Sequence, residues 1–121
     1  MENRAVAEIS DGVLKVRFLG RVGIAEIESY TKDLERLVPS LSPGFCLLTD
    51  LSNLESMEIA CAPYIENMMD LLGTKGVGLV VRVVPDKTRD IGFGIMSAFH
   101  YPESVRIVTC ETLAEAERVL V

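Results

Sequence analysis

The chain has 121 residues and a formal net charge of −6; 49% of its residues are hydrophobic and only 6% are aromatic. This length suits a single domain over residues 1–121 with an aliphatic core. The negative charge and the lack of a Lys/Arg cluster argue against nucleic acid as a partner. No apolar run approaches the roughly 20 residues of a membrane helix, and the first residues do not resemble a signal peptide. We therefore expect a cytoplasmic protein.

The N-terminal part of the sequence predicts a β-hairpin. Strands are expected at 5–10 and 13–19, joined by Asp11-Gly12, a strong two-residue turn signal. The second strand alternates apolar and basic residues, which indicates one buried and one solvated face. The apolar positions are Leu14, Val16 and Phe18, and the basic positions are Lys15 and Arg17.

Two helices and a buried strand are predicted next. An apolar stripe at helical spacing indicates a helix over 24–38, which Pro39 ends. Residues 45–50 are apolar without alternation, as in a strand covered on both faces. A second helix is expected over 57–72 with Gly73 as its C-terminal cap. Pro63 requires either a kink in that helix or a start near residue 62.

The last third of the chain continues as alternating strands and helices. Strands are predicted at 77–84 and 105–109, with a third helix at 90–101 between them. Thr112-Leu-Ala-Glu115 is a capping box that opens a fourth helix ending at Val121. This order predicts an α/β fold with a mixed sheet, in which an antiparallel hairpin precedes parallel β-α units packed with four helices.

Several segments resemble the STAS domain, the superfamily of SpoIIAA-like anti-sigma-factor antagonists. They are Leu48-Thr-Asp50-Leu51-Ser52 after a buried strand, Met57-Glu58 before an amphipathic helix, the strand at 77–84 with the Asp86-Lys87 turn, and the closing helix. The resemblance covers nearly the whole chain. It implies a bacterial, non-enzymatic regulatory module without a cofactor. Its partner would be a regulatory kinase or anti-sigma-like protein, or a second copy in a homodimer.

The resemblance also implies a phosphorylation site, which this chain lacks at the matching positions. In regulatory members, an aspartate before the second helix is followed by a Ser or Thr whose phosphorylation disrupts docking. Here Glu58 takes the place of the aspartate, and Ile59 and Ala60 take the hydroxyl positions. Ser56 and Ser52 are the remaining candidate phospho-acceptors. Ser56 could substitute only through a register shift and is otherwise expected to cap the helix, while Ser52 is otherwise expected to bond its own backbone.

Apolar residues outside the expected core stripe predict a partner surface. The inner face of the second helix is expected to contain Met57, Cys61, Tyr64, Ile65, Met68, Leu71 and Leu72, which leaves Ile59, Ala62 and Met69 outside it. On the predicted third helix, Phe93 and Met96 are expected to point away from the core. The predicted partner-binding residues are Ser52, Ser56, Glu58, Ile59, Ala60, Met69, Phe93 and Met96. Deep coverage of these helices would explain the same pattern.

No constellation of residues indicates catalysis or metal binding. His100 is the single histidine, and Cys46, Cys61 and Cys110 lack metal-ligand spacing, so we expect reduced core thiols. We therefore predict no enzyme activity and no metal. The alternative function is binding of a small, lipid-like apolar ligand in a cleft lined by Met68, Met69, Phe93 and Met96.

Overall fold

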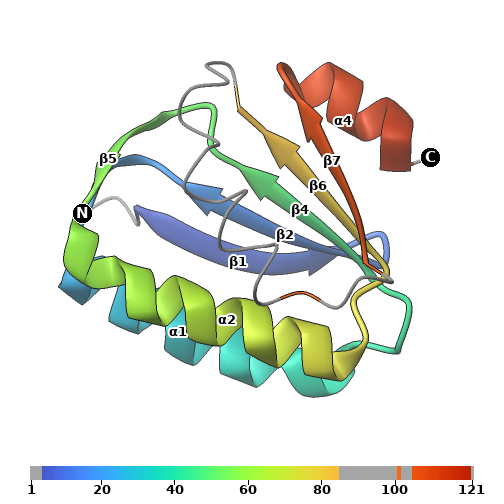
Figure 1. Ribbon diagram of the computed structural model, residues 1–121, viewed down its shortest axis with the longest axis horizontal. Coiled ribbons are helices and arrows are strands. Elements are labelled where there is room, and N and C mark those ends of the chain that lie inside the picture. Colours follow the sequence, from blue (N-terminus) through green and yellow to red (C-terminus); the bar gives the residue numbers. More distant parts are fainter. Residues whose placement is uncertain (1–3, 85–100, 102–104, 121) are drawn as a thin grey trace.

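The main architectural element is a five-stranded mixed sheet. The computed structural model describes residues 4–84, 101 and 105–120. The strands are β1 (Ala5–Ser10), β2 (Val13–Phe18), β4 (Cys46–Asp50), β6 (Leu79–Val83) and β7 (Arg106–Cys110), in the order β1-β2-β4-β6-β7. β1 and β2 are antiparallel, and every later pair is parallel. The predicted mixed α/β sheet is confirmed (Figure 1).

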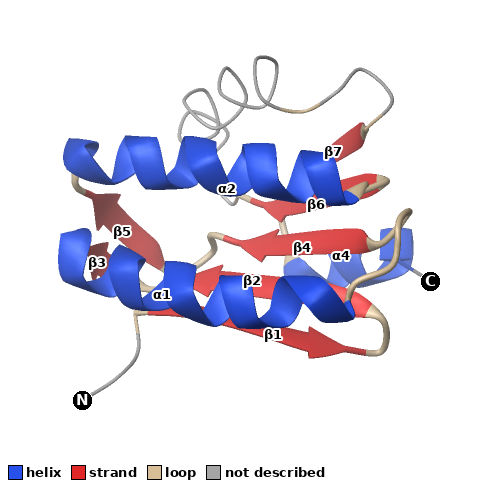
Figure 2. Cartoon of the chain, turned by 90° about the horizontal axis from the view of Figure 1, so that it is seen from below, coloured by secondary structure: helices blue, strands red, loops and turns tan. Residues whose placement is uncertain are grey.

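Helices cover both faces of this sheet. Helices α1 (Ile24–Leu37) and α2 (Ala62–Lys75) lie side by side on one face, whereas α4 (Leu113–Leu120) lies on the other (Figures 1 and 2). The described residues therefore contain three α-helices and two short 3-10 turns, η1 (Val38–Ser40) and η2 (Ile59–Cys61). The predicted third helix at 90–101 falls outside the described residues except for Tyr101.

The alternation predicted for β2 places its residues as expected. Leu14, Val16 and Phe18 are fully buried beneath α1 and α2, and Phe18 meets Tyr30 of α1 edge-to-face with ring centroids 5.2 Å apart. Strand β4 is buried on both sides because α4 covers part of the opposite face; Leu48 packs there with Val81 and Ala116.

A second, two-stranded parallel sheet was not predicted. It pairs β3 (Gly20–Val22) with β5 (Leu54–Met57) beyond the ends of the main strands. Segments this short carry too few side chains for a period-two pattern to stand out. The strand β5 therefore replaces part of the segment before the predicted second helix, and the 3-10 turn η2 replaces part of the first turn of that helix.

The boundaries of α2 correct the prediction of a helix over 57–72. The helix begins at Ala62 with Pro63 in its first turn, as the alternative prediction had it. Gly73 does not end it. The C-terminal cap is Gly76 in the left-handed conformation (φ 99°), whose N–H donates to the carbonyls of Leu72 and Gly73.

The later start of α2 also corrects its inner face. Met69 is only 2% exposed and belongs to the core with Ile65, Met68 and Leu72, whereas Leu71 is 37% exposed. The predicted face was centred partly on Met57, which lies in β5 rather than in the helix. Without that residue the stripe shifts toward Met69, so Met69 is not part of an outer partner surface.

Candidate functional site

The candidate site lies where β3, β5 and η2 meet the amino-terminal ends of α1 and α2. Strands β2, β4 and β6 point toward this region (Figures 1 and 2). In α/β folds, ligands and partners commonly bind beyond the carboxyl ends of parallel strands. The predicted segment Ser52–Ala60 therefore occupies a favourable position on the sheet.

Ser52 is fixed by the carboxylate that ends β4. The Ser52 N–H donates to Asp50 Oδ1 at 3.0 Å, and its hydroxyl donates to the same oxygen at 2.5 Å. Asp50 is only 8% exposed, and the following Leu51 N–H bonds the Val83 carbonyl at 3.0 Å. The expected bond of the Ser52 hydroxyl to its own backbone is replaced by one to Asp50, so this hydroxyl has a structural role.

Ser56 does not cap a helix, contrary to the prediction. It lies exposed in β5, opposite Arg21 in the parallel register, and the residue that caps α2 is Cys61. Next to it, Arg21 and Glu55 form an exposed ion pair with Nε and Oε2 3.8 Å apart. Ser56 therefore belongs to a solvated strand surface.

Glu58 joins the turn η2 to the start of α1. Its N–H donates to the Val22 carbonyl at 3.0 Å, and its own carbonyl accepts from the Cys61 N–H at 2.9 Å. A Cβ atom on Gly23 would lie 2.7 Å from Glu58 Oε1 and 3.2 Å from Glu26 Oε2. Position 23 therefore requires the space of a glycine to keep both carboxylates where they are.

Ile59 protrudes from this tethered turn. Its side chain is 92% exposed, and the neighbouring Ala60 and Pro63 are also exposed. Below it, Cys61 is fully buried, with Sγ 3.9 Å from the Val22 carbonyl oxygen. Burial, reinforced by the Glu58 and Glu26 carboxylates, raises the pKa of the Cys61 thiol. Backbone bonds and a buried anchor thus hold Ile59 out toward solvent.

The two helices beside the turn are joined by a hydrogen bond. The Tyr64 hydroxyl of α2 donates to Glu28 Oε1 of α1 at 3.1 Å, and this bond raises the pKa of Tyr64. The amino-terminal ends of α1 and α2 are thereby held together next to Ile59.

Some of the predicted partner-binding residues are not brought to this site. Met69 is in the core, and Phe93 and Met96 lie outside the described residues. Because Met68 and Met69 are both buried in the packed core, neither lines an open cleft of the kind expected for an apolar ligand. Within residues 4–84, 101 and 105–120, no group of three His, Cys, Asp or Glu side chains could hold a metal ion.

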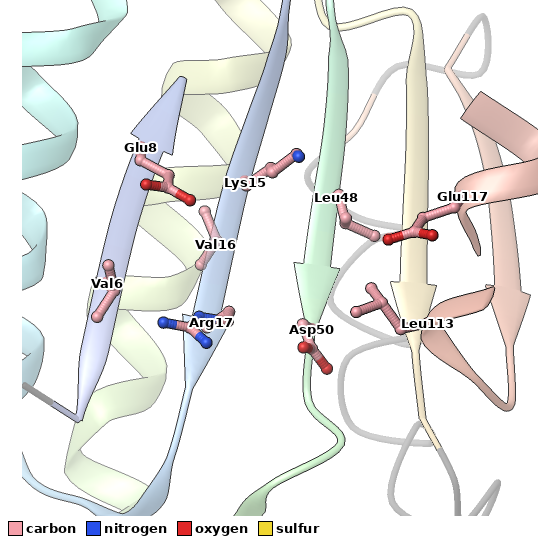
Figure 3. Close-up of a pocket in the computed structure, with 9 residues that line it drawn as sticks. All are labelled: Val6, Glu8, Lys15, Val16, Arg17, Leu48, Asp50, Leu113 and Glu117. Atoms are coloured by element: carbon pink, nitrogen blue, oxygen red, sulfur yellow. The ribbon is translucent and has the colours of Figure 1, made fainter. Parts of the chain in front are cut away.

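A pocket of about 230 Å³ lies beside α4, on the face of the sheet that α1 and α2 do not cover (Figure 3). Helix α4 covers β4, β6 and β7 but leaves the β1–β2 half of this face open. The lining is mixed in charge and consists of Val6, Glu8, Lys15, Val16, Arg17, Leu48, Asp50, Leu113 and Glu117. Lys15 and Arg17 lie here as their alternation with the apolar residues of β2 predicted. The mixed charges fit a solvated face.

Sequence reasoning missed Gly23, although a signal was present. Gly23 precedes the first residue of α1, and its N–H donates to Glu26 Oε2 at 3.1 Å, an N-cap with glutamate at the third helical position. The approach of Glu58 to the same glycine could not be predicted because it depends on how β5 pairs with β3.

Comparison with solved structures identifies the fold. A DUF3478-family protein with a SpoIIAA-like fold from Shewanella loihica aligns with TM-score 0.72 and 18% identity over 97% of this chain and 92% of that one. An anti-sigma factor antagonist from Mycobacterium paratuberculosis aligns with TM-score 0.62 and 22% identity over 95% and 91%. The Bacillus protein SpoIIAA in its phosphorylated form aligns with TM-score 0.66 and 12% identity over 97% and 99%.

These similarities show that the chain has the SpoIIAA-like fold, as its resemblance to STAS domains implied. No protein-family model and no curated protein matches the sequence. No helix within the described residues is long and apolar enough to span a membrane.

Proposed function

We propose that this chain is a non-enzymatic regulatory module that binds a protein partner through the turn η2, with Ile59 as its apolar anchor. The observation that carries the proposal is the 92% exposure of Ile59 on a turn that is fixed by the backbone hydrogen bonds of Glu58 and by the buried Cys61. An isoleucine so exposed contributes little to folding, but it gains hydrophobic free energy when a partner covers it. The fold supports this role because two of the similar structures are anti-sigma factor antagonists.

We propose further that docking here is an equilibrium without a phosphorylation switch. SpoIIAA has been solved in phosphorylated and unphosphorylated forms, but Ile59 and Ala60 offer no hydroxyl, and that of Ser52 is bonded to Asp50. Phosphopeptide mapping of residues 52–64 after incubation with lysate of the source cells tests this. An unmodified peptide is expected, and stoichiometric phosphate on Ser52 or Ser56 would overturn this part of the proposal.

Ile59→Asp tests the docking surface, with Leu113→Asp as its control. Leu113 is also an exposed apolar residue, at 41%, but it lies on α4 across the sheet. Affinity purification of the three proteins from the source cells should recover a partner with wild type and Leu113→Asp but not with Ile59→Asp. If the partner is a second copy, analytical sedimentation should show a dimer for wild type and Leu113→Asp but a monomer for Ile59→Asp. Equal recovery by Ile59→Asp would refute this surface.

A further inference from the structure

The chain segments that build the docking surface are strongly acidic. Residues 20–30 and 51–66 contain five glutamates but a single basic residue, Arg21, which pairs with Glu55. The glutamates are Glu26, Glu28, Glu55, Glu58 and Glu66. Although the Arg4 guanidinium also lies beside Gly20, the described residues that build this surface carry more negative than positive charge.

Two of these carboxylates are held together next to the anchor. Glu26 Oε2 and Glu58 Oε1 both lie within 3.2 Å of the point that a Gly23 Cβ would occupy. The N–H of Gly23 donates to Glu26 Oε2 at 3.1 Å, whereas Glu58 is exposed and adjacent to Ile59. Neither glutamate forms an ion pair with another described residue.

We infer that the partner presents an apolar socket for Ile59 bordered by lysine or arginine side chains. The inference rests on the proposed function, since it specifies the chemistry of what docks there. A neutral or acidic partner would remove water from Glu58, or bring like charges against it, without compensation. A basic rim supplies charge-assisted hydrogen bonds to these carboxylates and also speeds association with this acidic protein.

The inference can be tested with three synthetic amphipathic helical peptides as probes. The first has a leucine face and lysines on its flanks, the second replaces lysine by glutamate, and the third replaces leucine by serine. Each peptide is titrated into the ¹⁵N-labelled full chain. We expect the lysine–leucine peptide alone to shift the amide signals of residues 55–60, and to bind more weakly as the salt concentration rises.

Two variants test how much the Glu58 carboxylate contributes to the affinity for the lysine–leucine peptide. Glu58→Gln should weaken its binding by about 2- to 5-fold, the range of an exposed ion pair. Glu117→Gln, an exposed glutamate on α4 across the sheet, should leave it unchanged. Equal binding of the glutamate peptide, equal binding of the serine peptide, or no binding at residues 55–60 would overturn the inferred socket.

The same variants, measured in the complex with the cellular partner, separate the inference from the proposed function. If Ile59→Asp abolishes recovery of the cellular partner while Glu58→Gln and added salt leave that complex unchanged, docking at Ile59 stands and the basic rim is wrong. If Ile59→Asp has no effect on the cellular complex, the proposed function fails.

Discussion

Met69→Ala tests which face of α2 packs against the sheet. Met69 is 2% exposed and lies among Ile65, Met68 and Leu72 in the principal core. Truncation removes the thioether and leaves a cavity that a close-packed interior only partly fills. Leu71→Ala on the same helix is the matched control because Leu71 is 37% exposed.

The burial sets the expected size of the two effects. A buried methionine truncated to alanine costs about 2–5 kcal/mol, and the gain in helix propensity returns only a few tenths. Leu71→Ala should cost about 1 kcal/mol or less because much of its side chain already meets water. In a domain of this size the Met69 variant should therefore melt roughly 10–20 °C lower.

Urea unfolding followed by circular dichroism at 222 nm measures both variants. The midpoint should fall sharply for Met69→Ala and only slightly for Leu71→Ala, with similar slopes for both. A cost below about 1 kcal/mol for Met69→Ala, or equal costs for the two variants, would refute the inner face described here and return Met69 to the partner surface.

Three further measurements test other parts of the structure. Gly76→Ala should lower the free energy of unfolding more than Gly44→Ala. Both glycines have positive φ, but only at Gly76 would the new methyl group lie 3.2 Å from Pro43. Equal costs of the two substitutions in urea titrations would contradict this prediction. Burial raises the pKa of Tyr101 to about 12, although a nearby arginine opposes the rise. Tyrosine in the unfolded chain therefore ionises first, and the free energy of unfolding should fall between about pH 10 and 12. Tyr101→Phe should reduce this loss in urea titrations at those pH values, and an unchanged dependence of stability on pH would contradict the prediction. Ellman's reagent should modify the half-buried Cys46 faster than the buried Cys61, whose raised pKa leaves less thiolate. The reverse order of rates in cysteine-to-serine variants would argue against the buried position of Cys61 beneath η2.

The parts of the fold with strong periodic patterns were predicted well from the sequence. Helix α1 was expected over 24–38 and is observed over Ile24–Leu37, because a full apolar stripe and Pro39 define it. The hairpin was predicted from Asp11-Gly12 and the alternation in β2. These signals are local, so a single sequence carries them.

The parts that depend on contacts between distant segments could not be predicted. Strands β3 and β5 each need the other to form, and their pairing converts the expected start of the second helix into a strand and a 3-10 turn. Ile59 was placed outside the core as part of the second helix; the structure exposes it instead through η2. The approach of Glu58 to Gly23 follows from that pairing and has no local signal.

The most direct test of Ile59 as the docking anchor is calorimetry on the purified complex with its cellular partner. Ile59→Ala should raise the dissociation constant at least about 5-fold, the effect of losing more than 1 kcal/mol at a hot spot, while Leu113→Ala leaves it unchanged. An unchanged dissociation constant for Ile59→Ala would contradict the account, and a larger effect of Leu113→Ala would move the docking surface to α4.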